Sequence, residues 1–178
     1  MSEYPWYSAV SKDEPLNQGD FLKGCPLIVP VDMSAGFVEG KRTVDVELFD
    51  VVVMTQSCDL VPANPKVDIV LVCPYAELSQ FVGTSHFMGQ KKYQEEARKG
   101  NQPGFHILNS CTLPGFEFNM SYVALKDIYG VNIGTARALA QSTETRLRLM
   151  PPYREHLSQA FARLFMRVGL PQDIPKFE

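Results

Sequence analysis

The sequence has no long hydrophobic run. Its longest apolar stretches, at 51–54 and 69–73, are far shorter than the roughly 20 residues that a membrane-spanning helix needs. The first fifteen residues also lack a basic segment followed by an apolar one, which is the pattern of a secretory signal peptide. We therefore expect a cytoplasmic protein without a membrane partner.

Closely spaced cysteines are missing as well. The four cysteines, at positions 25, 58, 73 and 111, form no C-x-x-C pair, so the usual zinc-knuckle pattern is excluded and reduced thiols are expected. The sequence also lacks the glycine-rich motifs that bind phosphates or dinucleotides, as well as H-E-x-x-H and G-x-S-x-G. No cofactor and no metal site are predicted.

Length and composition are typical of a globular protein. Of the 178 residues, 45% are hydrophobic and 21% are charged. A chain of this length buries enough surface to fold without a disulfide or a metal. We predict one α+β domain over 1–178, with an N-terminal arm at 1–15, a β-rich body at 16–125 and a helical C-terminal extension at 126–178.

Two strongly apolar segments predict neighbouring buried strands. An alternating pattern at 43–50 becomes the β-branched run 51–54, and a second run at 67–75 follows a loop with proline and asparagine. Continuous apolar runs of this length are typical of strands covered on both faces. We expect them to form a hairpin at the centre of a sheet. The turn at Gly19–Asp20 should open a short strand that runs to Pro26, and a second extended piece is expected at 25–33, broken by Pro30.

Two helices are predicted in the second half of the chain. The charged segment 87–99 ends at Gly100, which suits a helix C-terminus, and only Tyr93 and Ala97 in it can face a core. We expect a surface helix there. A second helix, at about 152–168, begins after two prolines and has apolar residues at three- and four-residue spacing, which predicts a docked amphipathic helix. These residues are Leu157, Ala160, Phe161, Leu164, Phe165 and Val168.

Charge is divided unevenly along the chain. Residues 1–60 carry four basic and ten acidic residues, whereas 137–170 carry six arginines, no lysine and two glutamates. The two ends can therefore pair with each other across the fold. The arginines can equally face an anionic ligand, because guanidinium suits phosphate and carboxylate, or lie solvated on a helix surface. Arg163 and Arg167, one helical turn apart, belong to this set.

The segment 55–59 is the first candidate site, because small polar residues and a thiol directly follow a buried strand. A base that lowered its pKa would make Cys58 a catalytic nucleophile, with Gln56 and Ser57 beside it to bind the ligand. The alternative is a structural turn formed by Ser57 and Asp59, with Cys58 packed beneath it.

Carboxylates and arginines supply the other candidates. Asp20 and Asp59 can meet in a cleft and act as acid and base or hold a divalent cation, although Asp20 is also a common turn residue after glycine. Arg146 and Arg148 alternate in an extended segment, so both should point to the same face. The arginines expected to contact an anionic ligand are Arg42, Arg146, Arg148 and Arg154.

The first half of the chain resembles the PemK/MazF-like small β-barrel, the fold of many bacterial ribonuclease toxins. NQGDFL at 17–22 is similar to the Gly-Asp and strand that open that family, and VVVMTQS and VDIVLVCPY look like its pair of buried strands. The resemblance covers 17–78. It implies an SH3/PemK-like antiparallel barrel, to which a helical C-terminal extension is added here.

The sequence departs from that family at two positions. An arginine commonly precedes the first buried strand, but Phe49 and Asp50 stand there, with the nearest arginine at Arg42. A threonine or serine commonly follows the second strand, but Tyr75 follows Pro74. These two departures mean that the resemblance implies the family's fold more directly than its ribonuclease chemistry.

The function that these observations favour is binding of a nucleic acid or another anionic ligand by an intracellular β-barrel protein of toxin or defence type. One alternative is a cysteine-dependent hydrolase or transferase that uses Cys58. Another is a non-catalytic subunit that docks on a protein partner through its C-terminal helix. A second copy of the chain, forming a homodimer, is a further candidate partner.

Overall fold

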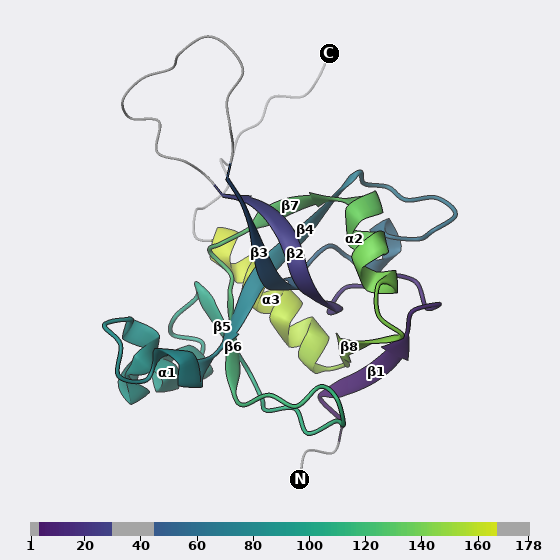
Figure 1. The fold of residues 1–178 in the computed structure, drawn as a ribbon. Helices are drawn as coiled ribbons and strands as arrows, with labels where there is room; N and C mark the ends of the chain where they lie inside the picture. The colour runs from purple at the N-terminus through teal and green to yellow at the C-terminus, as the bar shows by residue number, and fades with distance from the viewer. Residues whose placement is uncertain (1–3, 30–44, 167–178) are drawn as a thin grey trace, which may run out of the picture.

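The computed structural model describes residues 4–29 and 45–166, which form a mixed α+β fold (Figure 1). None of its helices in these ranges is long and apolar enough to cross a membrane. The strands are β1 (Tyr7–Ser11), β2 (Phe21–Val29), β3 (Asp45–Val53), β4 (Ile69–Glu77), β5 (Phe105–Leu108), β6 (Ser121–Ala124), β7 (Tyr129–Asn132) and β8 (Thr145–Leu149). The helices are α1 (Lys91–Arg98), α2 (Ile133–Gln141) and α3 (Tyr153–Phe165).

The strands form two antiparallel sheets. The larger has the order β2-β3-β4-β6-β5, with β7 also paired to β4, and the smaller contains β1 and β8. In the described ranges neither sheet closes into a barrel. The predicted α+β class is confirmed. The finer expectation of an SH3/PemK-like barrel stays a prediction.

The expected central strand pair is present as β3 and β4. Val51 pairs with Pro74 and Val53 with Val72, and the run Val51–Val53 is fully buried. Alternate residues of β3 enter different clusters, Val52 on one face and Val51 and Val53 on the other, because successive side chains point to opposite faces. A sheet covered on both faces explains why the sequence runs here are continuously apolar.

Strand β2 is longer than predicted. It continues through Pro26 to Val29, with a register shift between Leu22 and Cys25 where Gly24 adopts φ +59°. Such a bulge suits glycine, and a proline without an amide hydrogen is tolerated because β2 lies at the edge of the sheet. The short strand predicted up to Pro26 and the extended piece predicted from Cys25 therefore form one strand as far as Val29, and the rest of that piece lies outside the described residues.

The N-terminal arm is joined to the body by a strand as well as by its rings. β1 pairs with β8 from Tyr7 opposite Leu149 to Ser11 opposite Thr145. Residues 126–166 likewise contribute strands β7 and β8 as well as the two helices α2 and α3. The segment predicted as a helical extension therefore also contributes a strand to each sheet, β7 to the larger one and β8 to the smaller one.

The charged surface helix is confirmed as α1, which follows a short 3-10 turn at 87–89. Ala97 is buried and Tyr93 packs on a satellite cluster with Phe105 and Tyr122, as the sequence indicated. Gly100 donates its amide to Ala97 O at the helix end, with φ +79°. This packing holds the C-terminal end of α1 beside β5 (Figure 1).

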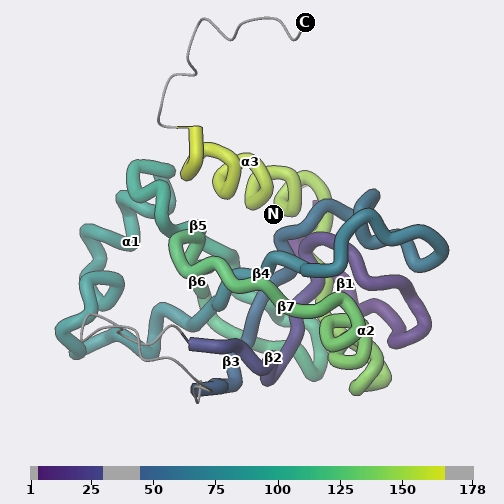
Figure 2. Tube along the Cα trace, turned by 90° about the horizontal axis from the view of Figure 1, so that it is seen from above, coloured from purple at the N-terminus to yellow at the C-terminus, as the bar shows by residue number. Residues whose placement is uncertain are grey.

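Helix α3 is docked as its apolar stripe predicts. Leu157 is 1% exposed, and Ala160, Phe161 and Leu164 pack against the same cluster, whereas Phe165 is 60% exposed. Val168 lies outside the described residues. The helix runs along one side of the large sheet, and its C-terminal end approaches β5 (Figure 2).

Removing buried atoms from α3 should cost far more stability than removing exposed ones. We expect Leu157→Ala to lower the free energy of unfolding by about 2–5 kcal/mol, through lost apolar transfer and the cavity left behind. Phe165→Ala, on the same helix, should cost less than about 1 kcal/mol because the ring is largely solvated. Urea unfolding followed by circular dichroism measures both, and equal losses would contradict the docking of α3.

Candidate functional site

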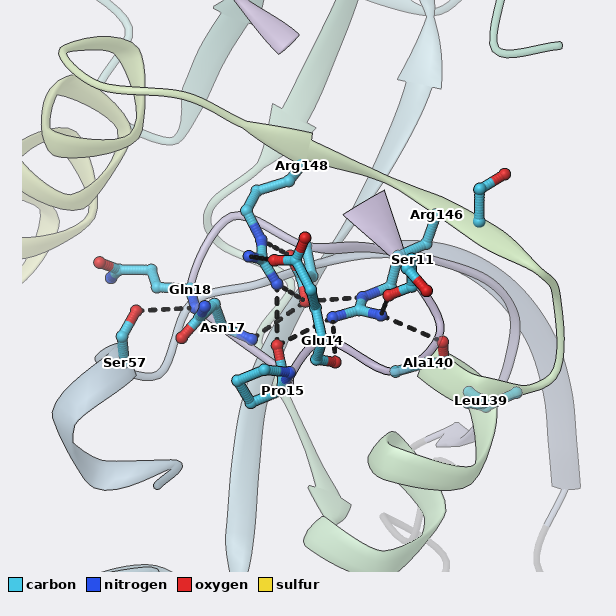
Figure 3. A network of polar contacts seen from close by, with 12 residues as sticks. Ser11, Glu14, Pro15, Asn17, Gln18, Ser57, Leu139, Ala140, Arg146 and Arg148 are labelled. Atoms are coloured by element: carbon cyan, nitrogen blue, oxygen red, sulfur yellow. Dashed lines mark hydrogen bonds and ion pairs between the residues drawn. The ribbon is translucent and has the colours of Figure 1, made fainter. Parts of the chain in front are cut away.

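Asp20 forms a buried ionic network with Arg146 and Arg148, the two arginines labelled in Figure 3. It is completely buried, and the side chains of Arg146 and Arg148 on β8 are 3% and 9% exposed. Arg146 Nε donates to Asp20 Oδ2 at 2.8 Å, and Arg148 donates to both carboxylate oxygens through Nε and Nη2. The amide of Asn17 adds a hydrogen bond to Oδ2 at 3.0 Å. The carboxylate is therefore satisfied by the protein itself.

Arg146 is saturated by the chain around it. Besides Asp20, its guanidinium donates to backbone carbonyls of Ser11 at 2.9 Å, Glu14 at 2.9 Å, Pro15 at 2.8 Å and Ala140 at 3.3 Å. A guanidinium has five N–H donors, so none remains for a ligand. The residue fastens the segment 11–15 to β8 and to the end of α2.

Arg148 connects the network to Glu14 and Pro15, near the protein surface. It donates to Pro15 O at 2.8 Å and to Glu14 Oε2 at 3.0 Å, and that carboxylate is half exposed. Burial lowers the pKa of Arg148, but Asp20 and Glu14 together raise it above its ordinary value. The guanidinium is therefore charged at every physiological pH.

Two sequence interpretations meet in this network. Arg146 and Arg148 do point to one face, and the acidic front pairs with the arginine-rich end, which was one of the alternatives left open. The geometry does not favour Asp20, Arg146 or Arg148 as ligand contacts, because all three are buried and satisfied by one another. The catalytic pairing of Asp20 with Asp59 is not favoured either.

The segment 55–59 is a structural junction in this fold. Ser57 Oγ accepts from the amide of Gln18 at 3.2 Å, and Gln56 Nε2 donates to Ser158 Oγ on α3 at 3.1 Å. Gln18 Nε2 in turn donates to Met54 O at 2.8 Å. These contacts connect the end of β3 to the loop before β2 and to α3, so Gln56 and Ser57 have structural roles.

Cys58 is the exposed member of the four cysteines. Its Sγ lies 3.6 Å from Asp59 Oδ1, and Asp59 also forms an ion pair with Lys66 at 3.7 Å. Among the described residues no histidine shares a hydrogen bond with this thiol. Cys58 is therefore not packed beneath the turn, as one interpretation expected, and the basic group beside its thiol is the carboxylate of Asp59, which also pairs with Lys66.

Two further arginines, Arg154 and Arg42, are predicted from the sequence to contact a ligand. Arg154 donates to Glu155 Oε1, its neighbour, and its aliphatic part lies against the turn at Gly19. Burial raises the pKa of Glu155, but the hydrogen bond from Arg154, a backbone hydrogen bond and the charges of Arg154 and His156 together outweigh it, so the pKa lies below its ordinary value. Arg42 lies outside the described residues.

A basic cleft of about 620 Å³ lies between α3, β5 and the C-terminal end of α1. It is larger than two further clefts of about 440 and 320 Å³. Cationic residues line it on both sides, Arg98 and Lys99 at the C-terminal end of α1 and Arg163 on α3, and no Asp or Glu is among its lining residues. Glu95 and Glu96 neutralise the α1 cations in part, whereas Arg163 has no ion-pair partner among the described residues.

Aromatic rings and two histidines form the rest of the cleft wall. Trp6 stacks on Tyr153, with ring centroids 3.7 Å apart and planes 11° apart, and His156 meets Tyr153 edge-on. His106 on β5 faces the same space. Burial, and to a smaller extent the charge of nearby His156, lower the pKa of His106 to about 4. His106 is therefore neutral at pH 7.

The spacing of four residues in α3 is the sequence pattern that indicates this cleft. Tyr153, His156, Ala160 and Arg163 recur at three- and four-residue spacing, so they share a side of α3 next to its apolar stripe. The sequence alone places Arg163 in the arginine-rich set and His156 beside the apolar stripe, without linking the two. No group of three or more His, Cys, Asp or Glu side chains in the described ranges is arranged to hold a metal ion.

Breaking the buried network should destabilise the protein severely. Asp20→Asn leaves two guanidinium groups buried beside a neutral amide, and we expect a loss of about 3–5 kcal/mol in the free energy of unfolding. The matched control is Glu144→Gln, which removes an ion pair to Lys12 whose carboxylate is 84% exposed; it should cost no more than about 1 kcal/mol. Denaturant unfolding compares them, and similar losses would contradict the structural role of Asp20.

The depressed pKa of His106 predicts a pH dependence of stability. The unfolded state takes up a proton near pH 6.5 that the folded state takes up only near pH 4, so stability falls as pH decreases between these values. The contribution is on the order of 2–3 kcal/mol. His106→Gln should remove this part of the pH dependence in urea unfolding at pH 7 and pH 4.5. An unchanged difference between the two pH values would refute the assignment.

Comparison with known proteins adds no family to this geometry. A scan against protein-family models finds no match to the chain. A search of curated proteins finds no significant relative. The functional argument therefore starts from the cleft and the buried network.

Proposed function

We propose that the protein binds a phosphate-bearing anionic ligand, of the nucleic-acid kind, in the basic cleft between α1, β5 and α3. The observation that carries the proposal is the cleft lining, which contains three cationic side chains and two histidines and no carboxylate. A cavity of this size fits the roughly 300–1,000 Å³ range of ligand pockets. Cations that face one concave space attract phosphate more strongly than scattered ones.

Arg163 is the cleft residue best suited to bind an anion. The arginines of the network around Asp20 are already bound to the protein itself. Arg163 belongs to the arginine-rich segment 137–170 and lies in the last turn of α3. Its guanidinium is exposed and without an ion-pair partner in the described part of the chain, so a phosphate can be bound without first breaking an internal contact. Lys99 approaches from the opposite wall. The two walls together would hold an anion between them.

The resemblance to PemK/MazF-like barrels belongs to this proposal as a hypothesis about ancestry and biological setting. An intracellular role in a prokaryotic toxin or defence system fits a small protein that binds nucleic acid. The paired buried strands β3 and β4 support the fold part of the resemblance. The proposed cleft lies outside 17–78, so ligand binding does not depend on it.

Salt dependence and one arginine variant test the proposed binding. A fluorescein-labelled, mixed-sequence RNA oligomer should bind at low ionic strength, with affinity that falls as salt rises. Arg163→Ala should weaken binding about five- to tenfold, equivalent to roughly 1 kcal/mol, and should reduce the slope of log K against log salt by about 0.7.

Lys66→Ala is the matched control for the loss of one positive charge. Lys66 is an exposed cation paired with Asp59 and does not line the cleft. Its removal should leave the affinity within about twofold of the parent protein. No binding at low ionic strength, or equal effects of the two variants, would contradict the proposed function.

A further inference from the structure

The Trp6–Tyr153 pair gives the cleft an aromatic wall that electrostatics alone does not require. Trp6 comes from the N-terminal arm and Tyr153 from the first turn of α3, and both line the cleft while only half-buried. Their rings are nearly parallel and 3.7 Å apart. A planar ligand ring can extend such a stack where a ring face is left exposed.

The pair is held in place before any ligand arrives. The amide of Met150 donates to Trp6 O at 2.8 Å, and Met150 O accepts from the amide of Tyr153 at 2.9 Å. The backbone of Met150 thus joins the two backbone positions from which the stacked rings extend. Tyr153 Oη also donates to Tyr4 O at 3.5 Å. A preorganised wall loses little conformational entropy on binding, which favours its use as a recognition surface.

Phosphate and ring recognition coincide in the same cavity. Lys99 and Arg163 provide charge, and side-chain amides of Gln102, Asn109 and Gln159 provide donors and acceptors for the edge of a base. A stacking platform beside a positively charged groove is the usual arrangement for binding single strands. We propose that the cleft stacks a nucleobase against Trp6 and Tyr153 while its cations hold the attached phosphate.

This inference rests on the proposed function and makes it narrower. It selects nucleotides and single strands over polyanions in general, since a polyanion without bases gains nothing from the aromatic wall. It also selects against duplexes, whose base faces are already covered by neighbouring base pairs. A free nucleotide and a strand end offer the same chemistry, a base joined to a phosphate. The experiment separates them.

Trp6 is the one tryptophan of the chain, so its fluorescence reports directly on the proposed stack. The full-length protein is titrated at low ionic strength with four probes: a short single-stranded oligonucleotide, the same backbone with abasic sites, its duplex, and adenosine monophosphate. The single strand should quench Trp6 emission and bind at least about tenfold more tightly than the abasic strand of equal charge.

Two variants on α3 separate stacking from stability. Tyr153→Leu removes a ring of the stack, whereas Phe161→Leu removes a half-buried ring of the same helix that does not line the cleft. Tyr153→Leu should reduce the affinity for the single strand about tenfold and leave the affinity for the abasic strand unchanged. Phe161→Leu should change neither, and thermal melting confirms that both variants are folded.

The outcomes distinguish the two proposals. Equal affinity for intact and abasic strands, without quenching, would overturn base stacking and leave anion binding in place. Failure of every probe to bind at low ionic strength would overturn both. Quenching that saturates with adenosine monophosphate identifies a free nucleotide as sufficient, whereas quenching by the oligonucleotide alone identifies a strand; either supports the stack.

Discussion

The buried contact between Asp20 and the two arginines of β8 is the constraint on which the rest of the structure depends. It ties the loop before β2 to β8, and through the carbonyls of residues 11–15 it also fixes β1. An ion in a protein interior is stable only when partners surround it, so these segments must assemble together or not at all. The position of α3, which directly follows β8, is set by the same assembly.

That constraint also determines where a ligand can bind. Two of the arginines that composition alone marks as anion contacts are satisfied inside the fold, and the turn after β3 is occupied with contacts to Gln18 and Ser158. Among the described residues, the cleft between α3, β5 and the end of α1 offers a cation without an ion-pair partner. There Arg163 meets a cation from α1 across a cleft without carboxylates, and the stacked rings of Trp6 and Tyr153 complete its wall.

The sequence predicts those features that depend on local pattern. The valine run of β3, the charged helix α1 and the stripe on α3 all follow from periodicity, so each was found at nearly its observed place. Long-range pairing has no such signal. Asp20 and Arg148 are 128 positions apart, and Trp6 reaches Tyr153 across almost the whole chain. Charge asymmetry is compatible with paired ends and with ligand binding, and the fold shows the pairing of Asp20 with Arg146 and Arg148.

The most direct test observes the arginines themselves. In nuclear magnetic resonance spectra of the protein labelled at arginine, the Nε–Hε signals of Arg146 and Arg148 should exchange slowly with solvent and should not shift when a single-stranded oligonucleotide is added. The signal of Arg163 should exchange quickly in the free protein and shift on titration. Ligand-induced shifts at Arg146 and Arg148, with Arg163 unaffected, would contradict the division between structural and ligand-binding arginines.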